Sequence, residues 1–120
     1  IRFAQMLLND GELNGSRVMS RKTLSLMHSN HLPPALLPYE LGGAPNPGFG
    51  FGLGSRVVMN VADTAGPGSV GEYGWAGAAK TYYWVDPKED LVGVFMTQYM
   101  VGFDSPEQDL RALTYQAIVD

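Results

Sequence analysis

The stretch from residue 49 to residue 98 constrains the fold more than any other part of this sequence. Its short runs alternate large apolar residues with small or polar ones, a spacing that places one set of side chains on each face of a β-strand. Strands are expected at residues 49–59, 70–77, 81–85 and 91–98. The short polar segment between the last two strands is typical of an antiparallel hairpin. The pattern therefore predicts an antiparallel sheet of about four strands.

Two details of these runs predict what covers the sheet. In residues 49–54 a glycine stands opposite each large apolar residue, so another backbone or a ligand can approach that face closely. In residues 81–85 and 91–98 both alternating sets are rich in apolar or aromatic residues, as in strands buried on both sides. We therefore expect the last helix to cover one face, and the opening helix with any chain before it to cover the other.

Helices are expected before and after the strands. Apolar residues at positions 3, 6 and 7 lie on one helical face, and this helix should end at residues 9–11, Asn-Asp-Gly. Ser20 is placed to cap a second helix at residues 21–28. Residues 105–108, Ser-Pro-Glu-Gln, combine the cap, the proline and the glutamine of a capping box at the start of a third. Segregated helices and strands predict the α+β class, with helices packed on the faces of the sheet.

Residues 33–48 separate the helices from the strands and contain five prolines and three glycines. A loop of that length inside a compact domain is usually functional or disordered. Residues 1–120 are interpreted as a single partial domain, because the sequence opens on Ile1 with no capping residue before its first apolar helical face. We expect this chain to be the C-terminal portion of a longer domain.

Composition excludes several kinds of chemistry. Without cysteine there are no disulfides, no thiolate catalysis and no Cys-ligated zinc. The formal net charge of −4, with scattered basic residues, argues against a nucleic-acid surface, and no run approaches the roughly 20 apolar residues of a membrane helix. His28 and His31 lie close together, but the local sequence offers no further ligands, so neither a metal nor a cofactor is expected. The composition does not distinguish between a cytoplasmic and a periplasmic protein.

The sequence does not contain a recognisable serine nucleophile. Ser16, Ser55 and Ser69 lack the glycine of a Gly-x-Ser-x-Gly elbow, and none of the seven serines has lysine three positions later. Neither histidine has an acidic neighbour placed to orient it, so both are interpreted as structural residues at a helix end and in a loop. Three acidic residues are expected to form a solvated hairpin turn: Asp86, Glu89 and Asp90.

One segment resembles a known active-site element. Residues 72–87 carry Trp75-Ala76-Gly77 and are followed by the strand at 91–98. This arrangement is similar to the third active-site element of the serine β-lactamase-related hydrolases, which include class C β-lactamases, penicillin-binding carboxypeptidases and family VIII carboxylesterases. In these proteins a strand carries Lys-Thr-Gly or a substitute such as Trp-x-Gly. The glycine-rich residues 48–54 and the helix at 3–11 with its Gly-Glu-Leu-x-Gly continuation extend the resemblance over nearly the whole chain.

The resemblance implies the C-terminal part of a β-lactamase-like fold, in a hydrolase that forms an acyl-enzyme on ester or amide substrates. The backbone N–H of Ala78 would serve as one oxyanion donor, and Trp75, Ala76 and Gly77 would line the substrate site. The nucleophile, its lysine and the Tyr-x-Asn or Tyr-x-Ser element would come from an upstream segment of the same protein. Because Trp75 carries no charge where many relatives have a cation, an esterase or peptidase-like enzyme is expected rather than an efficient β-lactamase. The chain alone should be inactive, and it should associate with itself.

Three other interpretations stay open. The chain could be a non-catalytic module that binds a partner through its sheet edge and glycine-rich strand. Trp75, Tyr82 and Trp84 could form a stacking surface for a small ligand, although such aromatic residues in strands also suit core packing. Finally, Gly74 and Gly77 could relieve crowding at a bend of the sheet, with Trp75 in the core.

Overall fold

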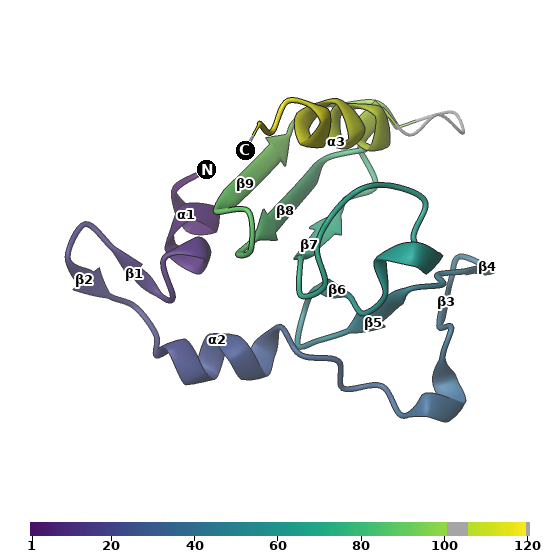
Figure 1. Cartoon of the computed structure of the whole chain (residues 1–120), viewed down its shortest axis with the longest axis horizontal. Helices are drawn as coiled ribbons and strands as arrows, with labels where there is room; N and C mark the ends of the chain where they lie inside the picture. Colours follow the sequence, from purple (N-terminus) through teal and green to yellow (C-terminus); the bar gives the residue numbers. More distant parts are fainter. Residues whose placement is uncertain (101–105, 120) are drawn as a thin grey trace.

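The computed structural model describes residues 1–100 and 106–119 (Figure 1). The helices are α1 Arg2–Leu8, α2 Arg21–Met27 and α3 Pro106–Gln116, with 3₁₀ turns at Pro34–Leu36 and Val61–Asp63. The strands are β1 Glu12–Leu13, β2 Ser16–Arg17, β3 Glu40–Leu41, β4 Ala44–Pro45, β5 Phe49–Phe51, β6 Arg56–Val58, β7 Tyr73–Ala76, β8 Tyr82–Asp86 and β9 Leu91–Phe95. They form the hairpins β1–β2 and β3–β4 and a five-stranded antiparallel sheet in the order β5-β6-β7-β8-β9. The predicted α+β class is confirmed.

The first strand of the sheet differs from the sequence prediction. One strand was expected over residues 49–59, and the structure instead has the β5–β6 hairpin. The chain reverses at residues 52–55, where the Gly52 N–H donates to the Ser55 carbonyl at 2.8 Å and Gly54 has a φ of 104°. Glycine fits both an extended position and a left-handed turn position, so the alternating pattern does not reveal the reversal. The sheet therefore has five strands where about four were expected.

The bare face predicted beside the glycine-rich strand is occupied by protein. A side chain at Gly50 would collide with the side chain of Asn30, and a side chain at Gly52 with the carbonyl oxygen of Met27. Asn30 Oδ1 also accepts a hydrogen bond from the Phe51 N–H at 3.1 Å. The glycines thus let the chain that follows α2 pack onto β5, which is the close backbone approach that the pattern predicts.

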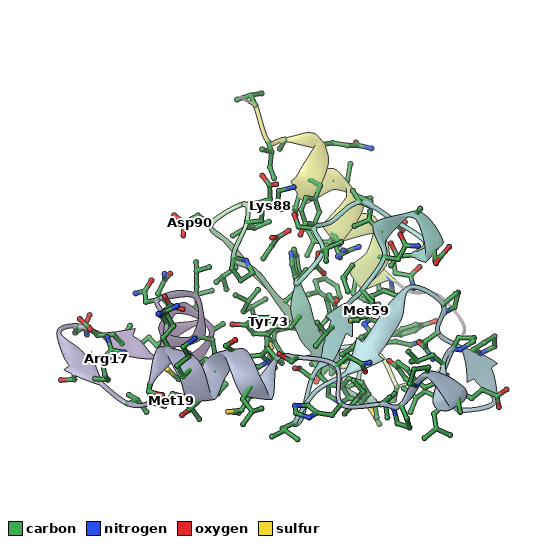
Figure 2. The ribbon with its side chains drawn as sticks, turned by 60° about the horizontal axis from the view of Figure 1, so that its bottom comes forward. Arg17, Met19, Met59, Tyr73, Lys88 and Asp90 are labelled. Atoms are coloured by element: carbon green, nitrogen blue, oxygen red, sulfur yellow. The ribbon has the colours of Figure 1, made fainter. Side chains whose placement is uncertain are left out.

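One face of the sheet is covered by α1 and α2. Helix α1 contacts β8 and β9, and Figure 1 shows it beside the sheet at the β9 edge. The buried apolar cluster on this side consists of Ala4, Met6, Leu7, Leu24, Val57, Tyr73 and Val85. Figure 2 shows Tyr73 in the interior, with Lys88 and Asp90 away from it at the β8–β9 turn. The expectation that the opening helix supplies one covering layer is therefore confirmed.

The other side of the sheet is held by α3 through buried polar contacts. Arg111 Nη2 lies 2.6 Å from Glu72 Oε2, and the Tyr115 hydroxyl lies 2.7 Å from both Glu72 Oε2 and Asp86 Oδ2. Glu72 is 2% exposed and Asp86 is fully buried. Burial and the hydrogen bonds to the two carboxylates raise the pKa of Tyr115 above its usual range, so its hydroxyl stays protonated. These contacts show that the last helix covers a face of the sheet, as predicted.

Burial on both sides is confirmed for one of the two strands for which it was predicted. In β8, Tyr82, Trp84 and Val85 are all buried. In β9, however, Val94 is 36% exposed, and Met96 just after the strand is 75% exposed. Burial on both sides is not observed for β9, because this strand is at the edge of the sheet and the described helices cover only part of it.

The predicted helices are present to within one or two residues. Ser20 caps α2 as expected, since its Oγ accepts the Thr23 N–H at 3.0 Å. The predicted cap of α3, Ser105, lies outside the described residues. Residues 33–48 hold the first 3₁₀ turn and the β3–β4 hairpin beside β5 (Figure 1). Within residues 1–100 and 106–119, no helix combines the length and the apolar character needed to cross a membrane.

Candidate functional site

The four residues predicted to form the site lie together at one end of β7 and in the turn after it. Trp75 and Ala76 are the last two residues of the strand, and Gly77 and Ala78 follow. The Trp75 side chain is partly buried, whereas Ala76, Gly77 and Ala78 are exposed. The motif is therefore accessible to solvent at the end of the strand.

The turn after β7 is tight and fixes the orientation of Ala78. The Gly77 N–H donates to the Thr81 carbonyl at 2.7 Å, and the Lys80 N–H donates to the Gly77 carbonyl at 3.0 Å. Residues 77–80 thus form a β-turn with Ala78 in its second position. No acceptor within residues 1–100 and 106–119 pairs with the Ala78 N–H. The turn presents this N–H as an unpaired donor on an exposed residue.

Both glycines of the motif also relieve crowding inside the hairpin, as the structural interpretation proposed. A side chain at Gly74 would collide with the Tyr83 carbonyl oxygen, and a side chain at Gly77 with Thr81 Oγ1. Gly77 is nevertheless exposed, so it contributes both to the turn and to the surface.

The backbone edge of β7 is open at the same end. Toward β8 the strand is paired as far as Ala76, which lies opposite Tyr82. Toward β6 the pairing stops at Gly74, opposite Arg56. Among the described residues, the last part of β7 therefore has a strand partner on one side only, and an extended ligand could add to its free side.

An aromatic row borders this open edge. The ring centroids of Trp75 and Phe51 are 5.1 Å apart in an edge-to-face arrangement, and those of Phe51 and Tyr39 are 5.8 Å apart in the same geometry. Both distances are in the favourable range for aromatic pairs. The row connects β7 with β5 and with the long segment at residues 33–48. Sequence reasoning missed Phe51 and Tyr39, because no local spacing relates them to Trp75.

A shallow hollow lies on the surface next to the motif. It is lined by Trp75, Ala76, Gly77, Thr81, Tyr82, Tyr83, Val94 and Met96. The three predicted substrate-binding residues thus border one concave surface, together with the exposed apolar end of β9. Tyr82 reaches this hollow, but Trp84 is 1% exposed, so the predicted three-residue stacking surface is not formed.

A serine and a histidine do meet in the structure, although not in a catalytic arrangement. His28 Nδ1 lies 2.8 Å from Ser55 Oγ, and the imidazole stacks on Tyr73 with ring centroids 3.6 Å apart. Ser55 is completely buried, and His28 Nε2 is buried with no hydrogen-bond partner among the described residues. Burial lowers the pKa of His28 to about 4. This pair joins the end of α2 to the β5–β6 turn and confirms the structural interpretation of His28.

The acidic turn after β8 is only partly as predicted. Glu89 and Asp90 are exposed, but Asp86 is fully buried. Its Oδ1 accepts the Lys88 N–H at 3.0 Å, and its Oδ2 lies beside the Tyr115 hydroxyl. The prediction of a solvated residue was wrong for Asp86, because partners from the turn and from α3 compensate for the burial of its carboxylate. Within residues 1–100 and 106–119, no cluster of three or more histidine or acidic residues could hold a metal ion.

Comparisons with known proteins match most of this chain to part of longer proteins. No family model matches. The chain is 37% identical over 103 residues to Protein Rv1367c and to the uncharacterized protein MT1414, both from Mycobacterium tuberculosis. Each match covers 82% of this chain and 26% of the relative, so the chain spans about a quarter of the length of these curated relatives.

Solved structures are also similar to most of this chain. LovD, the simvastatin synthase of Aspergillus terreus, has a TM-score of 0.68 and 20% identity, covering 96% of this chain and 32% of LovD. Its LovD6 mutant has a TM-score of 0.66 and 23% identity, covering 95% of this chain and 31% of the mutant. EstCE1, described as a hydrolase with promiscuous acyltransferase activity, has a TM-score of 0.62 and 23% identity, covering 79% of this chain and 22% of EstCE1. The fold of the chain is that of the C-terminal part of a β-lactamase-like fold.

Proposed function

We propose that this chain supplies one wall of the active site of a serine hydrolase that acts by acyl-enzyme chemistry on ester or amide substrates. The observation that carries the proposal is the unpaired N–H of the exposed Ala78, at the open end of β7. The description of EstCE1 as a hydrolase with acyltransferase activity, on the same fold, supports it. The nucleophilic serine, its lysine and the remaining catalytic element would come from an upstream segment of the same protein.

The wall would act mainly through its backbone. When a serine attacks an acyl carbon, negative charge develops on the carbonyl oxygen, and a preorganised N–H donor stabilises that charge. The Ala78 N–H would be one donor, and the N–H of the nucleophile would be the other. The substrate would lie along the free side of β7 as an added strand, near Gly77.

Trp75 would select substrates by size and polarity. Its ring is packed against Phe51, so it offers a fixed apolar surface and no positive charge. A substrate carboxylate would find no cation on this residue, whereas the apolar part of an ester could lie against the ring. We therefore favour carboxylic esters as substrates over β-lactams or peptides with a free carboxylate.

The test compares ester hydrolysis by the 120-residue chain with hydrolysis by the longer protein that includes the upstream segment. The proposal predicts no turnover by the chain alone, and turnover by the longer protein that is lost when its nucleophilic serine is replaced by alanine. Hydrolysis by the chain alone, unaffected by any upstream substitution, would refute the proposal.

A second candidate is a non-catalytic binding module that captures a partner by strand addition. Strand β9 favours it, because the edge strand and the residues after it, 91–100, contain no charged residue. A module of this kind should be a folded monomer with cooperative unfolding. Association of the isolated chain would instead favour the first candidate.

A further inference from the structure

A cavity of about 160 Å³ lies between the sheet and α3, beside the candidate site. Its walls include Phe49, Ala76 and Tyr82 from the sheet, Ala112 from α3, and the loop at residues 64–67. Phe49, Ala76 and Ala112 supply apolar surface, whereas Thr64 and Gln108 supply part of a polar lining. A cavity of about 150 Å³ inside a protein can hold a benzene molecule. By volume, a branched aliphatic group therefore fits against the apolar part of this lining.

A guanidinium group without an acidic partner borders the cavity. Arg56 stacks on Phe49 at 4.3 Å from the ring centroid, and its Nη2 donates to the Tyr82 hydroxyl at 2.8 Å. Within residues 1–100 and 106–119, no carboxylate lies within ion-pair distance of Arg56. Its charge is therefore held in place by neutral groups, and a planar acceptor such as a carboxylate could bind it.

A carboxylate with an unsatisfied oxygen borders the same cavity. Glu107 Oε2 is buried and has no hydrogen-bond partner among the described residues. The second basic residue in the wall, Arg111, is already paired with Glu72 at 2.6 Å. Burying an acceptor without a hydrogen-bond donor costs free energy, so a ligand N–H that donates to Glu107 Oε2 would be favourable.

We propose that this cavity binds a small zwitterion of the amino-acid class with an apolar side chain. The ligand carboxylate would pair with Arg56 and its ammonium group with Glu107. Its side chain would lie against the apolar part of the lining. The charges decide between ligand classes. A purely anionic ligand would be repelled by the Glu107 carboxylate, and a purely cationic one would be repelled by the Arg56 guanidinium. The site lies on the α3 side of the sheet and shares Ala76 and Tyr82 with the hollow beside β7, but its proposed ligand does not depend on the acyl-transfer function.

Binding of three probes of nearly equal shape tests the proposal by calorimetry. L-leucine carries both charged groups, 4-methylpentanoate lacks the ammonium group, and 3-methylbutylamine lacks the carboxylate. L-leucine should bind at least roughly tenfold more tightly than either of the other two, because each lacks one charge-assisted hydrogen bond. Equal binding of the three probes, or no binding of L-leucine, would overturn the proposal.

Two variants separate recognition from folding. Arg56→Gln should weaken L-leucine binding roughly tenfold or more, while Arg56→Lys, which keeps the charge, should retain part of it. Glu107→Gln should reverse the preference, so that 4-methylpentanoate binds at least as tightly as L-leucine. A loss of stability cannot produce such a reversal. The exposed residues Lys22 and Glu40 provide matched controls, and Lys22→Gln and Glu40→Gln should bind like the parent chain. An unchanged preference in Glu107→Gln would contradict the site.

Discussion

At the scale of single residues, the sequence predicted the motif of the candidate site but not the residues that contact it. The motif at residues 75–78 was recognised from its local order, and the structure places all four residues at one exposed strand end. The contact of Trp75 with Phe51 joins positions 24 residues apart, and that of His28 with Ser55 joins positions 27 apart. Such contacts depend on how the strands pair, which local spacing does not encode.

The buried His28 predicts a pH dependence of stability. Its pKa is about 4 in the folded chain and about 6.5 when unfolded, so folding favours the neutral imidazole. The stabilisation is fully present above pH 6.5 and is lost as the pH falls toward 4, by about 2–3 kcal/mol in the free energy of unfolding. Urea unfolding across this range should show the loss. The loss of stability at low pH should disappear in His28→Gln and persist in His31→Gln. If the free energy of unfolding of His28→Gln falls with pH as steeply as that of the parent chain, His28 is not the cause.

At the scale of elements, the sequence predicted the helices, the last three strands and the covering layers. It missed the β5–β6 reversal, since glycine suits both a strand and its turn. It also missed the burial of Asp86, because the partner of that carboxylate is Tyr115, 29 positions away on α3. Charge in a sequence indicates solvent exposure only where no distant partner compensates for burial.

The attachment of α3 depends on the buried Glu72–Arg111 pair. Arg111→Met leaves the Glu72 carboxylate buried without its cation and should lower the free energy of unfolding by about 3–5 kcal/mol. The exposed Arg17–Glu12 pair is the matched control, and Arg17→Met should cost about 1 kcal/mol or less. Adding Glu72→Gln to Arg111→Met should recover part of the loss. If urea unfolding shows similar losses in the free energy of unfolding for the two arginine variants, the Glu72–Arg111 pair does not hold α3 as described.

At the scale of the whole molecule, the chain leaves apolar surface uncovered at one side of its sheet. Val94 and Met96 are exposed at the β9 edge, and Phe3 on α1 is 64% exposed. An unprotected edge strand pairs readily with another chain. The account in which an upstream segment completes the protein therefore expects the isolated chain to associate with itself.

Self-association should depend on the β9 edge. Val94→Lys places a charge on this strand and should shift the isolated chain toward the monomer in sedimentation velocity at matched concentrations. Leu26→Lys, at a position 57% exposed on α2, should leave the association unchanged. A parent chain that stays monomeric at every concentration, or equal effects of the two variants, would argue against this role of β9.

The central claim is that the Ala78 N–H stabilises the oxyanion, and Ala78→Pro in the longer protein tests it most directly. Proline suits the second position of the turn at residues 77–80 and removes only the donor, while Ala78→Gly keeps the donor as a matched control. The account predicts that kcat for ester hydrolysis falls by about 10²–10³-fold in Ala78→Pro and stays close to the parent value in Ala78→Gly. A folded Ala78→Pro enzyme that hydrolyses the ester at the parent rate would contradict it.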